Sequence, residues 1–179
     1  MIRPRRRQAT ALGAGTLLAA ALAFAAPASA ATNARATAAP ATPTAASATP
    51  LVVNARWGGH CTYDRVVVDL QGYVPAVTVT RVPKLVYDGS GKPVPLAGTY
   101  FLEIRLHPAA GHDDAGHNVY AGPKLLKIYL PKLKGIALTG DYEGYVTLGA
   151  AFDTAPSFTS STLHSPERFV LDIAHPNVC

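Results

Sequence analysis

The chain has 179 residues and a formal net charge of +5 at pH 7. The basic excess is confined to the first 50 residues, because eleven Lys or Arg residues and eleven Asp or Glu residues follow them. A nucleic-acid-binding domain normally keeps a basic excess, so this balance excludes nucleic acid as the expected partner. The remaining stretch of about 129 residues is long enough for one domain with a hydrophobic core.

The first 30 residues have the three parts of a secretory signal peptide. Four arginines lie within residues 1–8, residues 11–26 carry no charge, and the small residues Ala28, Ser29 and Ala30 follow. The uncharged run is short for a membrane span, which needs about 20 apolar residues, and small residues before a cleavage point are typical of export signals. We therefore predict a signal peptide over residues 1–30 and an exported protein without a transmembrane anchor after signal removal.

Residues 31–50 consist almost entirely of Ala, Thr, Pro and Ser. A segment without large apolar side chains cannot offset the entropy lost when a chain becomes ordered. The composition therefore predicts a disordered linker ahead of a domain that spans residues 51–179.

From residue 51 onward, apolar and polar residues alternate over short stretches, as in half-buried strands. We expect strands at residues 51–57, 63–70, 77–82, 100–106, 136–139, 144–151, 157–163 and 168–174. Over residues 124–134 a short helix competes, since Pro123 can occupy its first position and Pro131 limits its length. The short, regular spacing predicts an all-β fold, a β-sandwich of two small sheets.

Two of the expected strands repeat one pattern, which indicates a rough internal duplication. The sequence YDRVVVDL at residues 63–70 is echoed by PERFVLDI at residues 166–173, and both contain an acid, an arginine, three apolar residues and an aspartate. Successive side chains in a strand point to opposite faces. Each segment therefore offers an apolar face to a core and an Arg/Asp pair to the other side.

The outward pairs, Arg65 with Asp69 and Arg168 with Asp172, are the candidate ligand-binding residues. Arginine suits carboxylate ligands because of its planar fork of donors, and aspartate can accept hydrogen bonds from sugar hydroxyls. The alternative is a ladder of cross-strand ion pairs on a solvated face. The pattern alone leaves both interpretations open.

The two cysteines, Cys61 and Cys179, most simply form one disulfide in an exported domain of this size. Cys61 comes before the first echoed segment and Cys179 is the last residue. The chain-entropy model assigns about 4.7 kcal/mol to closing a loop of about 100 residues. We expect this bridge to hold the C-terminus in place.

Other motifs give no enzyme assignment. The sequence GSGK at residues 89–92 lacks the preceding glycine and the following Ser or Thr of a phosphate-binding loop. A cluster of metal-ligating residue types, His112, Asp113, Asp114 and His117, occupies one loop, but its spacing matches no standard metal site. An exposed polar turn explains the same residues, so we expect no metal, no other cofactor and no catalytic residues.

Several segments together resemble the AMIN-like domain of exported actinobacterial proteins, a relative of the AMIN domain that accompanies N-acetylmuramoyl-L-alanine amidases. The matching pieces are YDRVVVDL, SGKPVPLAG at residues 90–98, FLEIRLHPAAGHDDAG at residues 101–116, GDYEGYVTLG at residues 140–149, and the ending PERFVLDIAHP. The resemblance implies a non-catalytic β-sandwich that binds peptidoglycan at the cell envelope and does not cut it.

The leading hypothesis is an exported, monomeric, non-catalytic module that binds peptidoglycan or an associated wall polymer, either retained at the wall or released. The first alternative is a secreted module that binds or inhibits a protein. The second is a metal-dependent enzyme that uses the loop from His112 to His117.

Overall fold

The computed structural model describes residues 48–179, so the predicted signal peptide and most of the predicted linker lie outside the described residues. The described residues form nine strands: β1 (Leu51–Gly59), β2 (Tyr63–Gln71), β3 (Ala76–Val82), β4 (Tyr100–His107), β5 (Leu125–Lys127), β6 (Leu133–Tyr142), β7 (Tyr145–Phe152), β8 (Phe158–Leu163) and β9 (Arg168–Ala174). None of the described residues forms a helix that is long and apolar enough to cross a membrane.

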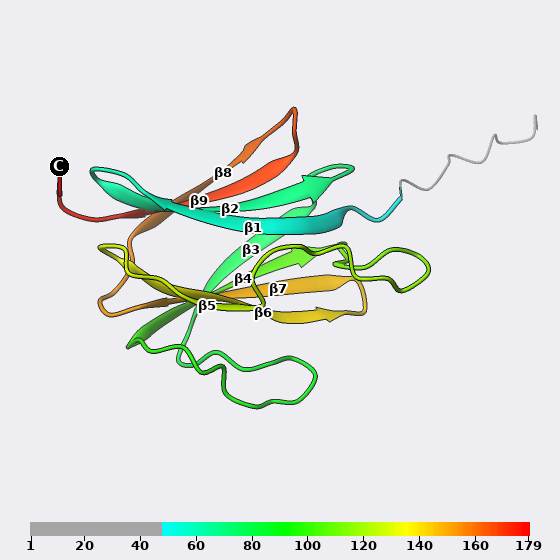
Figure 1. Cartoon of the computed structure of the whole chain (residues 1–179), viewed down its shortest axis with the longest axis horizontal. Coiled ribbons are helices and arrows are strands. Elements are labelled where there is room, and N and C mark those ends of the chain that lie inside the picture. Colours follow the sequence, from blue (N-terminus) through cyan, green and yellow to red (C-terminus); the bar gives the residue numbers. More distant parts are fainter. Residues whose placement is uncertain (1–47) are drawn as a thin grey trace, which may run out of the picture. The chain divides into compact units, whose positions relative to one another are not determined.

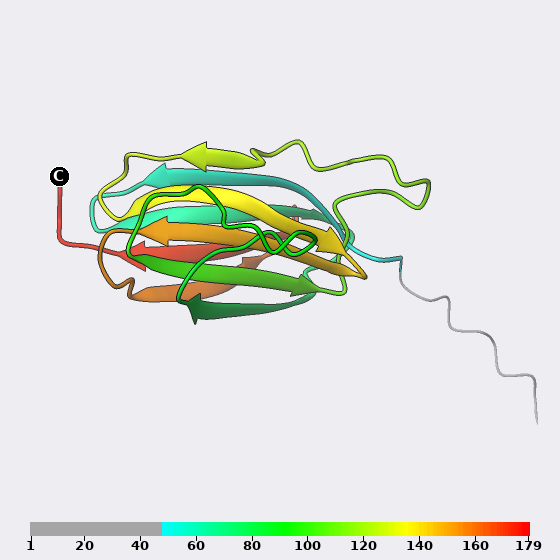
Figure 2. The same cartoon turned by 90° about the horizontal axis from the view of Figure 1, so that it is seen from below.

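The strands form two antiparallel sheets that pack face to face (Figures 1 and 2). One sheet has four strands in the order β1-β2-β9-β8, and the other has five in the order β3-β4-β7-β6-β5. The all-β sandwich predicted from the strand spacing is confirmed. All strands that the alternation predicted are present, although several extend by one to three residues beyond the expected ends.

Alternation of side chains explains how both sheets supply the core. Buried and partly exposed residues alternate along β2, and Val66, Val68 and Leu70 are its inward residues. Their counterparts on the five-stranded sheet include Leu102 and Leu106 of β4, which are fully buried. Inward residues of the two sheets belong to one hydrophobic cluster, as expected for sheets packed face to face.

The short helix considered for residues 124–134 is wrong, because this segment contains the strand β5 and no helix. β5 pairs with β6, whose edge offers main-chain hydrogen-bonding partners. The residues that contact the core are Leu126, Ile128 and Leu130, at a spacing of two residues. A spacing of two is the period of a strand, whereas a helix would turn these side chains to different sides.

The segment between β3 and β4, residues 83–99, covers part of the outward face of the five-stranded sheet (Figure 1, green). Its residues Leu85, Val94 and Leu96 form a second hydrophobic cluster with Ala137 and Ala151 of the sheet. Glycine at position 149 makes room for this contact, because a Cβ atom there would lie 2.7 Å from the Leu85 side chain. The segment predicted as a turn-rich loop thus packs as a second layer.

The predicted disulfide between Cys61 and Cys179 is confirmed, with 5.1 Å between the two Cα atoms. β2 begins and β9 ends at the same end of the four-stranded sheet because the two strands are antiparallel neighbours. Next to the bridge, the Val178 N–H donates to the Cys61 carbonyl over 2.9 Å. The C-terminus is therefore tied to the start of β2 by covalent and main-chain bonds.

The acid of the first echoed segment, Asp64, is fully buried and joins the two sheets. Its Oδ2 accepts hydrogen bonds of 2.7 Å from the main-chain N–H groups of Lys132 and Leu133 at the start of β6. Its Oδ1 lies 3.3 Å from Nε2 of His175, just after β9. Asp64 therefore fixes the end of the sandwich on which the candidate site lies.

Candidate functional site

The outward face of the four-stranded sheet brings the Arg and Asp residues of both echoed segments onto two neighbouring strands. The register of β2 and β9 places Arg65 opposite Asp172 and Asp69 opposite Arg168. Residues four apart on one strand are about 13 Å apart, whereas residues directly opposite have Cβ atoms about 5 Å apart. The pairing therefore runs across the strands, and not within each segment.

Arg65 and Asp172 form a forked ion pair at the centre of this face. Arg65 Nε donates to Asp172 Oδ1 over 2.6 Å, and Nη2 donates to Oδ2 over 2.7 Å. The Arg65 guanidinium carbon also lies 5.0 Å from the centre of the Tyr63 ring. Held by a carboxylate and an aromatic ring, the guanidinium is oriented before any ligand arrives.

Asp69 pairs with a residue outside both echoed segments. Arg56 of β1 donates from Nε and Nη2 to the two carboxylate oxygens of Asp69, each over 2.6 Å. Arg168 makes no ion pair with the described residues, and its Nε donates to the Pro166 carbonyl over 3.1 Å. The cross-strand ion-pair interpretation thus describes Arg65 and Asp69, while Arg168 keeps its terminal N–H groups free of intramolecular partners within the described part of the chain.

Both forked pairs lie partly in solvent. The side chains of Arg65 and Asp172 are 34% and 25% exposed. The hydrogen bond with Asp172 raises the pKa of Arg65, and the hydrogen bond with Asp69 likewise raises the pKa of Arg56. Exposed pairs contribute about 0–1 kcal/mol to stability, so these pairs position charges more than they hold the fold.

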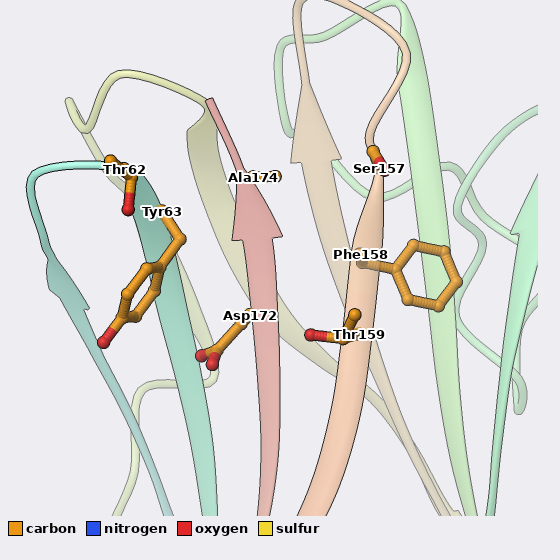
Figure 3. A pocket seen from close by; sticks show the side chains of 7 residues that line it. All are labelled: Thr62, Tyr63, Ser157, Phe158, Thr159, Asp172 and Ala174. Atoms are coloured by element: carbon orange, nitrogen blue, oxygen red, sulfur yellow. The ribbon is translucent and has the colours of Figure 1, made fainter. Parts of the chain in front are cut away.

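A hollow of about 390 Å³ adjoins the central pair at the disulfide end of the face. Tyr63 of β2, Asp172 of β9 and Thr159 of β8 come from three neighbouring strands and line it (Figure 3). The remaining lining residues are Thr62, Ser157, Phe158 and Ala174. The hollow therefore combines a carboxylate, four side chains with hydroxyl groups and aromatic carbon, a mixture suited to a polar organic ligand.

Sequence reasoning missed Arg56, Tyr63 and the hydroxyl residues of β8. Tyr63 could have been found, because it precedes Arg65 by two residues and so shares its face. β8 carries an exposed run of Thr and Ser residues with no charge, from Thr159 to Thr162. Only the sheet order places this run beside Asp172.

The candidate metal loop divides into two separate pairs. His112 Nδ1 lies 2.9 Å from Asp141 Oδ2, which raises the pKa of His112. His117 lies against Asp113, whose pKa is lowered chiefly by the hydrogen bond from the His117 main chain. Within residues 48–179, no group of three or more His, Cys, Asp or Glu side chains could hold a metal ion. Local hydrogen bonding therefore explains this loop.

The two sheets form an antiparallel β-sandwich module, and the outward face of its four-stranded sheet is a polar surface with ion pairs. The family model of the AMIN-like domain matches residues 50–175, and the chain belongs to this family. Searches of curated proteins and of solved structures returned no match. Membership of the family indicates a cell-wall-related module of a typically non-catalytic kind. The family and the disulfide are consistent with an extracellular protein.

Proposed function

We propose that this protein is an exported, non-catalytic module that binds peptidoglycan through the outward face of the four-stranded sheet. The carrying observation is the hollow lined by Tyr63, Thr159 and Asp172 beside the oriented Arg65 guanidinium. Residues 1–30 would direct export, and residues 31–50 would form the predicted linker ahead of the domain. The domain itself would occupy residues 51–179.

The chemistry of the face matches the two components of peptidoglycan, which are sugars and short peptides with carboxylates. Asp172 uses one lone pair of each oxygen for Arg65, and a carboxylate oxygen can accept a second hydrogen bond from a sugar hydroxyl. Thr159 and Ser157 can donate or accept at the opposite side of the hollow. Tyr63 supplies apolar area at one side of the hollow.

Arg168 is the residue best placed for a peptide carboxylate. It lies about 13 Å along β9 from Asp172, and it has no ion pair among the described residues. A planar fork of free donors binds a carboxylate with two hydrogen bonds. The proposed ligand therefore runs along β9, with a sugar near Asp172 and a stem peptide toward Arg168 and Asp69.

The test is sedimentation of the purified protein with insoluble peptidoglycan, comparing the wild type with Arg65→Ala, Arg168→Ala and the double variant. A hydrogen bond to a charged group contributes about 1.5–3 kcal/mol, which is about tenfold or more in affinity. We expect each single variant to weaken retention about tenfold and the double variant to abolish it.

Lys92→Ala is the matched control, because it removes an exposed positive charge from the segment over the other sheet. Circular dichroism melting confirms that each variant is folded. Equal retention of the folded double variant and the wild type would move the site elsewhere. A wild type that does not sediment with peptidoglycan would overturn the proposed function.

A further inference from the structure

The uncovered part of the outward face of the five-stranded sheet carries a cluster that the proposed function does not use. We define the hairpin-tip cluster as Asp88, Arg105, Tyr142, Glu143 and Tyr145, which line a hollow of about 190 Å³. Because the two sheets pack through their inward faces, this cluster lies on the opposite side of the sandwich from the Arg65 face. The two surfaces can therefore bind separate ligands.

The turn between β6 and β7 determines the position of the two tyrosines. Glu143 and Gly144 have φ angles of 49° and 77°, so both central residues of this two-residue turn are left-handed. The turn makes Tyr142 and Tyr145 direct cross-strand partners, and such partners project from the same face. Tyr142 is 71% exposed and Tyr145 is 40% exposed.

Tyr145 is fixed between two neighbours on β4. The His107 ring stacks on it, with 4.1 Å between the ring centres and 22° between the planes. The Arg105 guanidinium carbon lies 5.8 Å from the Tyr145 ring centre, and Arg105 itself pairs with Glu103 over 3.2 Å. Tyr145 therefore forms a rigid wall of the hollow, while the ring of Tyr142 stays open to solvent.

Asp88 is brought to the hollow by the covering segment. Its main-chain N–H donates to the Thr139 carbonyl over 3.0 Å. Its carboxylate lies over Gly140, where a Cβ atom would collide with it. A bulge in β6 between Leu138 and Gly140 accompanies this contact. The carboxylate is thus held close to the sheet surface and beside the tyrosines.

We propose that the hairpin-tip cluster binds one pyranose ring of a neutral glycan, with the ring lying against Tyr142. A pyranose presents an apolar C–H surface that an exposed aromatic ring covers, and hydroxyl groups at its rim. The Asp88 carboxylate can accept from these hydroxyls, and the Arg105 guanidinium can donate to them. The inference goes beyond the proposed function, because it needs no contact with the Arg65 face.

Charge distinguishes a neutral glycan from ionic ligands. The cluster has the carboxylates of Asp88 and Glu143 against the single cation Arg105, so an anionic polymer would be repelled. A ligand cation would compete with Arg105, which already lies at the Tyr145 ring and pairs with Glu103. A neutral ligand rich in hydroxyls meets neither obstacle, because it uses the carboxylates as acceptors and leaves the Arg105 pair intact.

The test is titration of the ¹⁵N-labelled full-length protein with two soluble tetrasaccharides, one of N-acetylglucosamine and one of glucose, followed by NMR. We expect at least one of them to shift the signals of Gly144, Tyr145 and the Arg105 side chain. Tyr142→Ala should weaken binding about threefold to tenfold, as expected for the loss of one aromatic stacking contact. Tyr142→Phe, which keeps the ring, should bind as the wild type does.

Tyr129→Ala is the matched control, because Tyr129 is 91% exposed and lies outside the cluster. Binding of neither tetrasaccharide, or equal affinity of the wild type and Tyr142→Ala, would overturn the inference, as would binding of tetramethylammonium alone at these residues. The two experiments distinguish a failure of this inference from a failure of the proposed function. Loss of the sugar site leaves sedimentation through Arg65 and Arg168 untouched, and loss of sedimentation leaves the tetrasaccharide shifts at Tyr145 untouched.

Discussion

The outward faces of the two sheets differ in whether another segment covers them and in the size of the side chains that they carry. The four-stranded sheet has no covering segment among the described residues, and long charged side chains such as Arg56 and Arg65 lie paired across its surface. The five-stranded sheet is partly covered by residues 83–99, and its covered positions carry small residues such as Ala137, Ala151 and Gly149. Small outward residues therefore mark a face that receives a second layer, and long polar residues mark a face that meets solvent or a ligand.

Breaking the disulfide should have the largest effect and should act on the four-stranded sheet. Replacing Cys61 and Cys179 together by Ser removes the only covalent tie of the C-terminus to β2 within residues 48–179. Removal of a native disulfide from a small exported domain costs about 2–5 kcal/mol. Chemical unfolding of the variant measures this loss, and a count of two reactive thiols in the untreated wild-type protein would contradict the bridge.

Because only the five-stranded sheet is covered, shortening an apolar side chain should lower the stability of the protein more at the covered face than at the outward face of the four-stranded sheet. Leu85 is 4% exposed within the second cluster, and truncation of a buried Leu to Ala costs about 2–5 kcal/mol. Val67 is only partly buried on the outward face of β2, so Val67→Ala should cost less than about 1.5 kcal/mol. Denaturant midpoints of both variants test the comparison, and equal losses would show that the segment does not function as a second core.

The two-residue turn between β6 and β7, which carries the hairpin-tip cluster, stores backbone strain at Glu143. Glu143 has a φ of 49°, and the left-handed conformation costs an ordinary residue about 1–2 kcal/mol. Asn is favoured at this turn position, so Glu143→Asn should stabilise the protein by about 0.5–1 kcal/mol. Asp114→Asn removes an equal charge without this backbone relief and should leave the melting temperature unchanged.

The ion pairs of the uncovered face should contribute little to stability. Arg56→Ala and Arg65→Ala should each lower the free energy of unfolding by about 1 kcal/mol or less, because both pairs are partly exposed and screened. Thermal unfolding at low and high salt checks this expectation. A large loss in either variant would assign these pairs to the fold and weaken their assignment to ligand binding.

The smallest expected effect is a pH dependence of the stability that His112 contributes from the loop of residues 111–122. The hydrogen bond with Asp141 raises the pKa of His112 above its ordinary value of 6.5. Its stabilising contribution is therefore fully present below the unfolded pKa and is lost as pH rises through the folded pKa. The difference in melting temperature between the wild type and His112→Ala should be larger at pH 5.5 than at pH 9, and a difference independent of pH would contradict this.

The short-range pattern of the sequence was sufficient for every strand except β5, and the count of two cysteines was sufficient for the disulfide. Alternation identified β2 and β9 with nearly correct ends, because burial on one side of a sheet imposes a period of two. It failed at β5, where Leu125 beside Leu126 obscured the alternation of Leu126, Ile128 and Leu130. Two cysteines in one domain left a single intramolecular pairing, and the antiparallel neighbours β2 and β9 bring both to one end.

The partners of the candidate site residues could not be read from the pattern. Arg65 and Asp69 share one strand and one face, yet each pairs with a residue from another strand, Asp172 and Arg56. Side chains on neighbouring strands approach more closely than side chains four residues apart on one strand. Which strand becomes the neighbour depends on the order of the whole sheet.

The sequence by itself therefore determined the strands other than β5, their inward and outward residues, and the family of this protein. Tertiary structure alone decided which face is covered and which residues surround each hollow. Leu85 of the covering segment packs on the five-stranded sheet, and Thr159 lies beside Asp172 because β8 pairs with β9. The physical reason is that a strand's period depends on its own residues, whereas contacts between strands and layers depend on how the whole chain packs its core.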